Sequence, residues 1–184
     1  MGGSVMKNST RRIAFAGILA AAYAAFTIVE GLLVPTLAYG DIQFRFAEAF
    51  SVLCCFTPAA IPGMVIGCIV ANVFSSVSIL DTVIGSCATL LACVITWKLS
   101  HRMEKSPWIA WLVPLPTILC NALIVGAEVA YVWYYLEGEA FWASYGLCAL
   151  FVGIGEAAVM YLLGMPLLLW LRSNKRLSGR LREI

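Results

Sequence analysis

The chain places five carboxylates and one arginine within segments that are otherwise apolar. These residues are Glu30, Arg45, Glu48, Asp81, Glu128 and Glu156. An ionisable side chain at the centre of a membrane helix costs roughly 2.5 to 3.5 kcal/mol, so each needs a structural or functional reason. Because negative charge exceeds positive charge in this set, the sequence predicts protonated carboxylates, a bound metal ion, or a ligand with positive charge and several hydrogen-bond donors.

Amide and phenol side chains accompany these charges. Asn121 and Glu128, seven residues apart, are expected to share one helix face, which Tyr131 continues outward. Gln43 and Asn72 are expected near the same outer surface, although Asn72 and Asn121 also suit hydrogen bonds between helices. Aromatic rings beside amides and carboxylates suit an aromatic nitrogen heterocycle, which stacks on rings and donates hydrogen bonds.

Several of the charged residues also have a structural interpretation. Arg45 and Glu48, one helical turn apart, suit an ion pair at a helix start as well as a binding site, and Asp81 suits a first turn. Glu30 is expected to reach the bilayer surface. Glu128 and Glu156 have no basic partner in their own segments, which favours a functional role for both.

The composition excludes a water-soluble domain. Hydrophobic residues make up 62% of the 184 residues, charged residues make up 12%, and the mean hydropathy is +0.92. A bilayer is therefore the solvent, and about 20 apolar residues per helical crossing leave room for about six crossings. A net charge of +2 gives no indication of a nucleic-acid partner.

The apolar segments predict an all-α, polytopic membrane protein. They span residues 13–34, 44–56, 58–75, 79–99, 108–135 and 141–171. Basic residues gather before the first, after the fourth and after the sixth, which predicts six transmembrane helices with cytoplasmic N- and C-termini. The second segment is short for a crossing. The alternative is that it forms a shallow or kinked hairpin with the third, around Pro58 and Pro62.

The segments leave little room for other domains. Residues 1–10 are expected to be an expression scar and N-terminal tail, residues 11–172 the six-helix transmembrane domain, and residues 173–184 a basic cytoplasmic tail. The seven cysteines lie in apolar segments without a CxxC pair, so we expect packing residues and no metal site. Without a GxxxxGK[ST] loop, an HExxH motif or an intramembrane histidine, we expect no enzyme activity and no cofactor.

Small residues mark one face of the first segment. Ala16, Ala20 and Ala24 recur at a spacing of four, with further small residues beside them. Such a stripe lets another helix approach closely, either within the bundle or on a separate subunit. Composition does not choose between these two uses.

Several stretches resemble the QueT family of queuosine-precursor transporters. They are the run from Gly40 to Ala49 with its Gln-Phe-Arg-x-x-Glu core, the alanine stripe, the connection from Asn72 to Asp81, and Asn121. Family members are substrate-binding S-components of energy-coupling factor (ECF) transporters. The resemblance implies a multi-pass protein of the bacterial plasma membrane, docked through its first helix onto a transmembrane coupling subunit driven by two ATPase subunits.

The resemblance also implies a 7-deazaguanine ligand, either queuine or one of its precursors preQ1 and preQ0. The guanine-like edge has adjacent N–H donors that one carboxylate accepts in pairs, a role we expect of Glu128 or Glu156. Asn121 and Asn72 are then expected to orient the ligand.

The side arms of queuine and preQ1 carry a cationic amine, which would balance the excess of carboxylates. Glu48 and Asp81 are the candidates for this amine, with Arg45 holding Glu48 in place and Gln43 contributing from the first outer loop.

A proton-coupled secondary transporter of a small cationic or heterocyclic solute is the main alternative. In it Glu128 and Glu156 relay protons, and uptake needs no ATPase subunits. The small size, the lack of a visible internal repeat and an inner half without polar groups argue against it. A membrane enzyme ranks last, because a nucleophile and base pair is missing.

Overall fold

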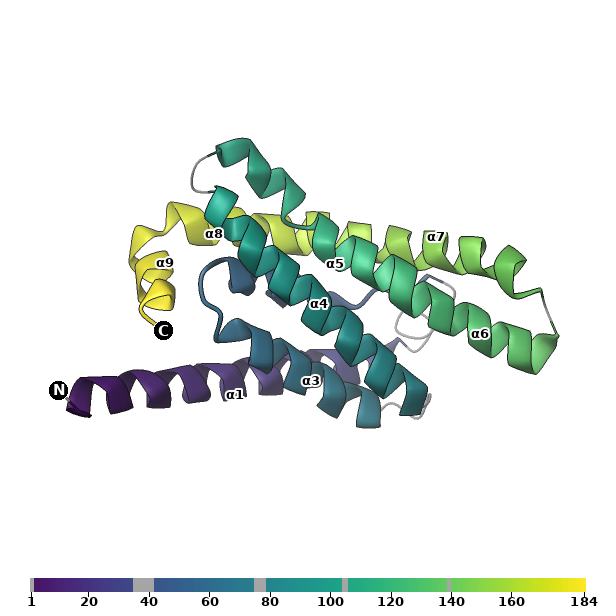
Figure 1. Ribbon diagram of the computed structural model, residues 1–184, viewed down its shortest axis with the longest axis horizontal. Coiled ribbons are helices and arrows are strands. Elements are labelled where there is room, and N and C mark those ends of the chain that lie inside the picture. Colours follow the sequence, from purple (N-terminus) through teal and green to yellow (C-terminus); the bar gives the residue numbers. More distant parts are fainter. Residues whose placement is uncertain (1, 35–41, 75–78, 104–105, 139) are drawn as a thin grey trace.

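The protein is all-helical wherever its structure is described, as the sequence predicts. The computed structural model describes residues 2–34, 42–74, 79–103, 106–138 and 140–184. In these ranges the elements are α1 (Gly2–Leu33), η1 (Phe46–Cys55), α3 (Ala60–Phe74), α4 (Ile79–Met103), η2 (Pro107–Leu112), α5 (Leu115–Cys120), η3 (Asn121–Val125), α6 (Gly126–Glu137), α7 (Phe141–Val159), η4 (Met160–Gly164), α8 (Met165–Ser173) and α9 (Lys175–Arg182). The longer helices lie alongside one another in a single bundle (Figure 1).

Four helical stretches of the described chain are long and apolar enough to cross a bilayer. They are Ser9–Leu33, Ile79–Met103, Pro107–Leu136 and Phe141–Ser173. The last two each continue through a π-helical turn, η3 and η4 respectively. These four stretches agree with the first, fourth, fifth and sixth predicted segments.

The second and third predicted segments are shorter elements. η1 is a 3-10 helix of 10 residues and α3 is an α-helix of 15 residues. At rises of about 2.0 and 1.5 Å per residue, each is roughly 20 Å long, below the hydrocarbon thickness of about 30 Å. These lengths suit the hairpin alternative, and the six-crossing topology with cytoplasmic termini stays a prediction.

η1 lies in the centre of the bundle. Ala47 and Cys54 join one apolar cluster with α1, α3 and α4, whereas Val52 and Cys55 join a second cluster with α5, η4 and α8. A 3-10 helix advances further per residue than an α-helix and is thinner. The residues at its start are therefore enclosed by several helices at once.

Glycines on α3 allow close contact with α1. A Cβ at Gly67 would lie 2.6 Å from the Tyr23 Cβ, and a Cβ at Gly63 would lie 2.9 Å from the Ala16 carbonyl oxygen. Ala20 and Ala24 are buried. The predicted alanine stripe thus lies largely against α3. Docking of a partner on α1 stays a prediction, and the partner would have to contact the exposed residues beside the stripe.

The two ends of the chain lie at the same end of the bundle (Figure 1). The Arg12 side chain contacts the backbone oxygen of Ile184. Residues 2–10, expected as a tail, continue α1, and most of the expected C-terminal tail forms α9. Leu177 and Leu181 of α9 pack against the bundle, which leaves Lys175 and Arg176 exposed.

Candidate ligand-binding site

Most of the sequence-predicted polar residues are buried and interact with one another. The buried ones are Arg45, Glu48, Asn72, Asp81, Asn121, Glu128 and Glu156. Glu156 interacts electrostatically with Glu48 and Arg45, and Glu128 interacts with Asp81 and Arg45. These five residues interact as one charged group, to which Glu30 of α1 also contributes. Together with Asn72 and Asn121 we call them the polar cluster.

Arg45 forms a buried ion pair with Asp81. The Arg45 Nη2 lies 3.1 Å from the Asp81 Oδ1, and the Asn72 Nδ2 donates to the Asp81 backbone oxygen at 3.0 Å. Gly85 lies one helical turn after Asp81 in α4 and leaves space for the Asn72 side chain. A Cβ at Gly85 would lie only 3.0 Å from the Asn72 Nδ2. The ion pair joins the start of η1 to the start of α4.

Glu48 is held by two hydroxyl groups. The Tyr23 hydroxyl donates to the Glu48 Oε1 at 2.6 Å, and the Thr89 hydroxyl donates to the same oxygen at 3.1 Å. The hydrogen bonds of Glu48 thus differ from the expectation that Arg45 holds it. The reason is geometric: Arg45 turns to Asp81, while α1 and α4 supply the donors to Glu48.

Asn121 and Glu156 form the third part of the polar cluster. The Asn121 Nδ2 donates to the Glu156 Oε1 at 2.8 Å, and both residues are about 1% exposed. Asn121 begins the π-helical turn η3. A π-turn inserts one extra residue and rotates the rest of the helix by about 100°, so Asn121 and Glu128 no longer share the face that a regular helix would give them.

The segment before η1 passes directly over Gly155. A Cβ at Gly155 would overlap the Gln43 carbonyl oxygen and lie 2.8 Å from its carbonyl carbon. Only glycine leaves room for the backbone here. The contact places the Gln43 backbone beside Glu156, the next residue of α7, whereas the Gln43 side chain is partly buried.

Glu30 differs from expectation, and Tyr131 lies outside the buried set. Glu30 is 7% exposed and accepts a hydrogen bond from the Phe46 backbone N–H at 3.3 Å, so it is not a surface-seeking residue. Tyr131 is 44% exposed and lies against Tyr135, with ring centroids 5.4 Å apart. Its role as a ligand contact stays a prediction.

Sequence reasoning missed Tyr23 and Thr89 as partners of Glu48. A signal for Tyr23 was present, because Tyr23, Thr27 and Glu30 follow a helical spacing of four and three in an otherwise apolar segment. All three are buried on one face of α1. Thr89 gave no comparable signal, since threonine is common in apolar helices.

Several buried polar atoms of the polar cluster have no hydrogen-bond partner among the described residues. They are Glu30 Oε1, Arg45 Nη1, Glu48 Oε2, Asn121 Oδ1, Glu128 Oε2 and Glu156 Oε2. A buried polar atom left unpaired costs about 1 to 3 kcal/mol, and more when the group is charged. These atoms are concentrated in the polar cluster, so their hydrogen-bonding capacity is available to further partners.

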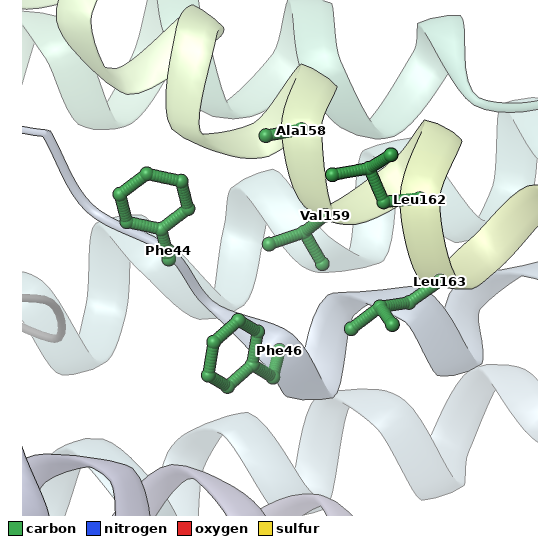
Figure 2. Close-up of a pocket in the computed structure, with 6 residues that line it drawn as sticks. All are labelled: Phe44, Phe46, Ala158, Val159, Leu162 and Leu163. Carbon is green, nitrogen blue, oxygen red and sulfur yellow. The ribbon is translucent and has the colours of Figure 1, made fainter.

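An apolar pocket lies beside the polar cluster and is separate from it. Its volume is 280 Å³, and Phe44 and Phe46 face Ala158, Val159, Leu162 and Leu163 across it (Figure 2). Phe44 and Phe46 alternate with Arg45, which is buried in the polar cluster. Because this pocket offers no polar side chain, it cannot orient a hydrogen-bonding ligand.

The polar cluster does not resemble a metal centre in the described part of the chain, where no group of three or more potential metal ligands occurs. Its chemistry is that of hydrogen-bond acceptors around one guanidinium group. Such a site suits recognition of a molecule rich in N–H donors.

Comparison with known proteins gives one match. The model of a family described as QueT transporter matches residues 13–173. The match includes every residue of the polar cluster. Neither a curated protein nor a solved structure matches the chain.

Proposed function

This chain belongs to the QueT transporter family, and from that premise we propose that it is the substrate-binding subunit of an ECF-type importer. In this proposal it lies in the bacterial plasma membrane and captures a 7-deazaguanine queuosine precursor from outside. Partner subunits then drive uptake with ATP.

The unpaired atoms of the polar cluster carry this proposal. They comprise four carboxylate oxygens and one amide oxygen as acceptors, with a single guanidinium nitrogen as donor. A 7-deazaguanine has the complementary pattern, because its ring and exocyclic amine present several N–H donors and its carbonyl is an acceptor. A cationic side arm adds further donors and balances the negative charge.

The geometry suggests a role for each part of the polar cluster. Glu156, oriented by Asn121, accepts the adjacent donors of the guanine-like edge through its unpaired Oε2. Arg45, fixed by Asp81, donates its unpaired Nη1 to the ring carbonyl. Glu48 accepts the side-arm amine through Oε2, and Glu128 is a second acceptor for the ring.

The exposed side of α1 is the proposed contact with the coupling subunit. Gly17, Ala21 and Ala25 are exposed at a spacing of four. A groove of 530 Å³ continues this side and is lined by Arg12, Ile13, Ala16, Gly17, Pro58, Ala59, Pro62 and Ile66. Small exposed residues next to an apolar groove allow a partner helix to approach closely.

A matched pair of glycines tests this contact. Gly17 and Gly146 are both exposed helical glycines with open space around them. We expect Gly17→Trp to retain binding of preQ1 but to lose uptake in cells that express the ECF partners. Gly146→Trp should retain both.

Two outcomes contradict parts of the proposal. Full uptake by Gly17→Trp would show that this side of α1 is not the docking surface. Uptake by this chain in cells without the ATPase subunits would favour the proton-coupled alternative, for which the buried unpaired carboxylates would be proton carriers.

A further inference from the structure

The inward face of α1 makes two contacts with the start of η1. Tyr23, Thr27 and Glu30 lie on this face and are buried. The Tyr23 hydroxyl reaches the Glu48 side chain, and the Glu30 Oε2 accepts from the Phe46 N–H. Thr27 instead donates to the Tyr23 carbonyl oxygen within α1. Two side chains of one helix therefore hold the segment that carries Glu48.

The two oxygens of Glu48 have unequal surroundings. Oε1 accepts from both Tyr23 and Thr89, which uses the two acceptor sites of a carboxylate oxygen. Oε2 is buried and has no partner among the described residues. Oε2 is thus the oxygen of this buried side chain that can still accept hydrogen bonds.

Tyr23 is itself closely packed. It is 1% exposed, and its ring lies against Gly67 of α3, where an added Cβ would be 3.0 Å from the Tyr23 Cγ. A rigid ring with a buried hydroxyl fixes its hydrogen-bond partner more firmly than a flexible donor does. The Gly67 contact therefore determines where the Tyr23 hydroxyl, and with it the Glu48 carboxylate, lies.

We propose that Tyr23 is a positioning residue for ligand capture, which holds the Glu48 carboxylate so that Oε2 meets the cationic amine of the ligand. The inference rests on the proposed function, in which Glu48 is a ligand contact. It makes α1 a part of the binding site as well as the proposed docking helix. It also makes Tyr23 a determinant of preference for ligands with an ammonium arm over ligands with a neutral arm.

Tyr23→Phe tests this role, because it removes the hydroxyl and keeps the ring against Gly67. The two probes are preQ1, which has an aminomethyl arm, and preQ0, which has a cyano arm. We expect the affinity for preQ1 to fall about five- to tenfold, the value of one net hydrogen bond, and the affinity for preQ0 to change less than about twofold. Tyr161→Phe is the control, because its hydroxyl bonds to the Trp111 carbonyl oxygen outside the polar cluster.

A double-mutant cycle separates positioning from a general structural effect. In a Glu48→Gln background, Tyr23→Phe should have no further effect on preQ1 binding, since the group on which it acts is gone. Thr89→Val, which removes the other donor to the same oxygen, should give a smaller loss with the same preference for preQ1 over preQ0. It serves as the second variant if Tyr23→Phe does not fold.

The outcomes are distinct. Equal loss of preQ1 and preQ0 affinity, or a further loss in the Glu48→Gln background, would make Tyr23 merely structural and overturn the inference. Wild-type binding of preQ1 that is insensitive to Glu48→Gln would overturn it while leaving the proposed substrate standing. If the wild type bound neither ligand, the proposed function and this inference would fall together.

Discussion

Replacing Glu156 with glutamine should weaken ligand binding without unfolding the protein. The Glu156 Oε1 accepts from the Asn121 Nδ2 at 2.8 Å, and Oε2 has no partner in the described structure. Glutamine retains one side-chain oxygen, which is expected to accept the hydrogen bond from the Asn121 amide. The new side-chain NH₂ group then occupies the position of Oε2 and faces the donors of the ligand.

The size of the effect depends on the bond that is lost. A hydrogen bond to a charged group contributes about 1.5 to 3 kcal/mol, which corresponds to a rise in Kd of about 10- to 150-fold. The melting temperature should not fall, because glutamine has nearly the same size as glutamate and keeps the oxygen that accepts from Asn121.

Isothermal titration of the purified protein with preQ1, together with thermal melting, measures both quantities. Glu183→Gln is the control, because Glu183 is an exposed carboxylate near the C-terminus, and it should bind as the wild type does. Unchanged affinity in Glu156→Gln would refute the assignment of Glu156 to the ligand. A loss of affinity accompanied by a large drop in melting temperature would instead show that Glu156 is needed for the fold.

Two further substitutions test the frame of the site. Gly155→Val should displace the backbone at Gln43 and abolish ligand binding, because the valine side chain would overlap the Gln43 carbonyl oxygen. The same titration measures this loss, and wild-type affinity would contradict the contact between Gly155 and Gln43. Arg45→Met should leave Asp81 buried without its cation and lower the free energy of unfolding by about 3 to 5 kcal/mol. Denaturant unfolding measures this value, and a loss below about 1 kcal/mol would show that the ion pair does not stabilise the fold.

The sequence predicted the residue types of the polar cluster better than their partners. An ionisable or amide side chain in an apolar segment is conspicuous in one dimension, so Glu48, Asp81 and Glu156 could be identified directly. Which of these side chains bond to each other depends on how each helix is rotated about its axis. The spacing of residues along the sequence does not determine this rotation. Arg45 was expected beside Glu48 but bonds to Asp81.

Two features of the backbone could not be anticipated from periodicity. The π-turn that begins at Asn121 rotates the next part of the helix, so Asn121 and Glu128 do not share the face that a spacing of seven implies. The second apolar segment forms a 3-10 helix, which lies inside the bundle and brings Glu48 within reach of Tyr23. Both depend on tertiary packing rather than on local preference.

The small residues of the first segment illustrate a choice that composition left open. The sequence allowed either packing within the bundle or docking to another subunit. Ala20 is buried beside Gly67 of α3, whereas Gly17 and Ala21 are exposed. The small residues of α1 therefore divide into the alanine stripe, which packs largely on α3, and a neighbouring set that is exposed.

The most direct test of the proposed function is a binding titration of the purified wild-type protein, without ATPase subunits, against queuine, preQ1, guanine and riboflavin. We expect tight binding of queuine and preQ1, weaker binding of guanine, which lacks the cationic arm, and none of riboflavin. Failure to bind queuine and preQ1, or binding of riboflavin in their place, would contradict the assignment of the polar cluster to a 7-deazaguanine ligand.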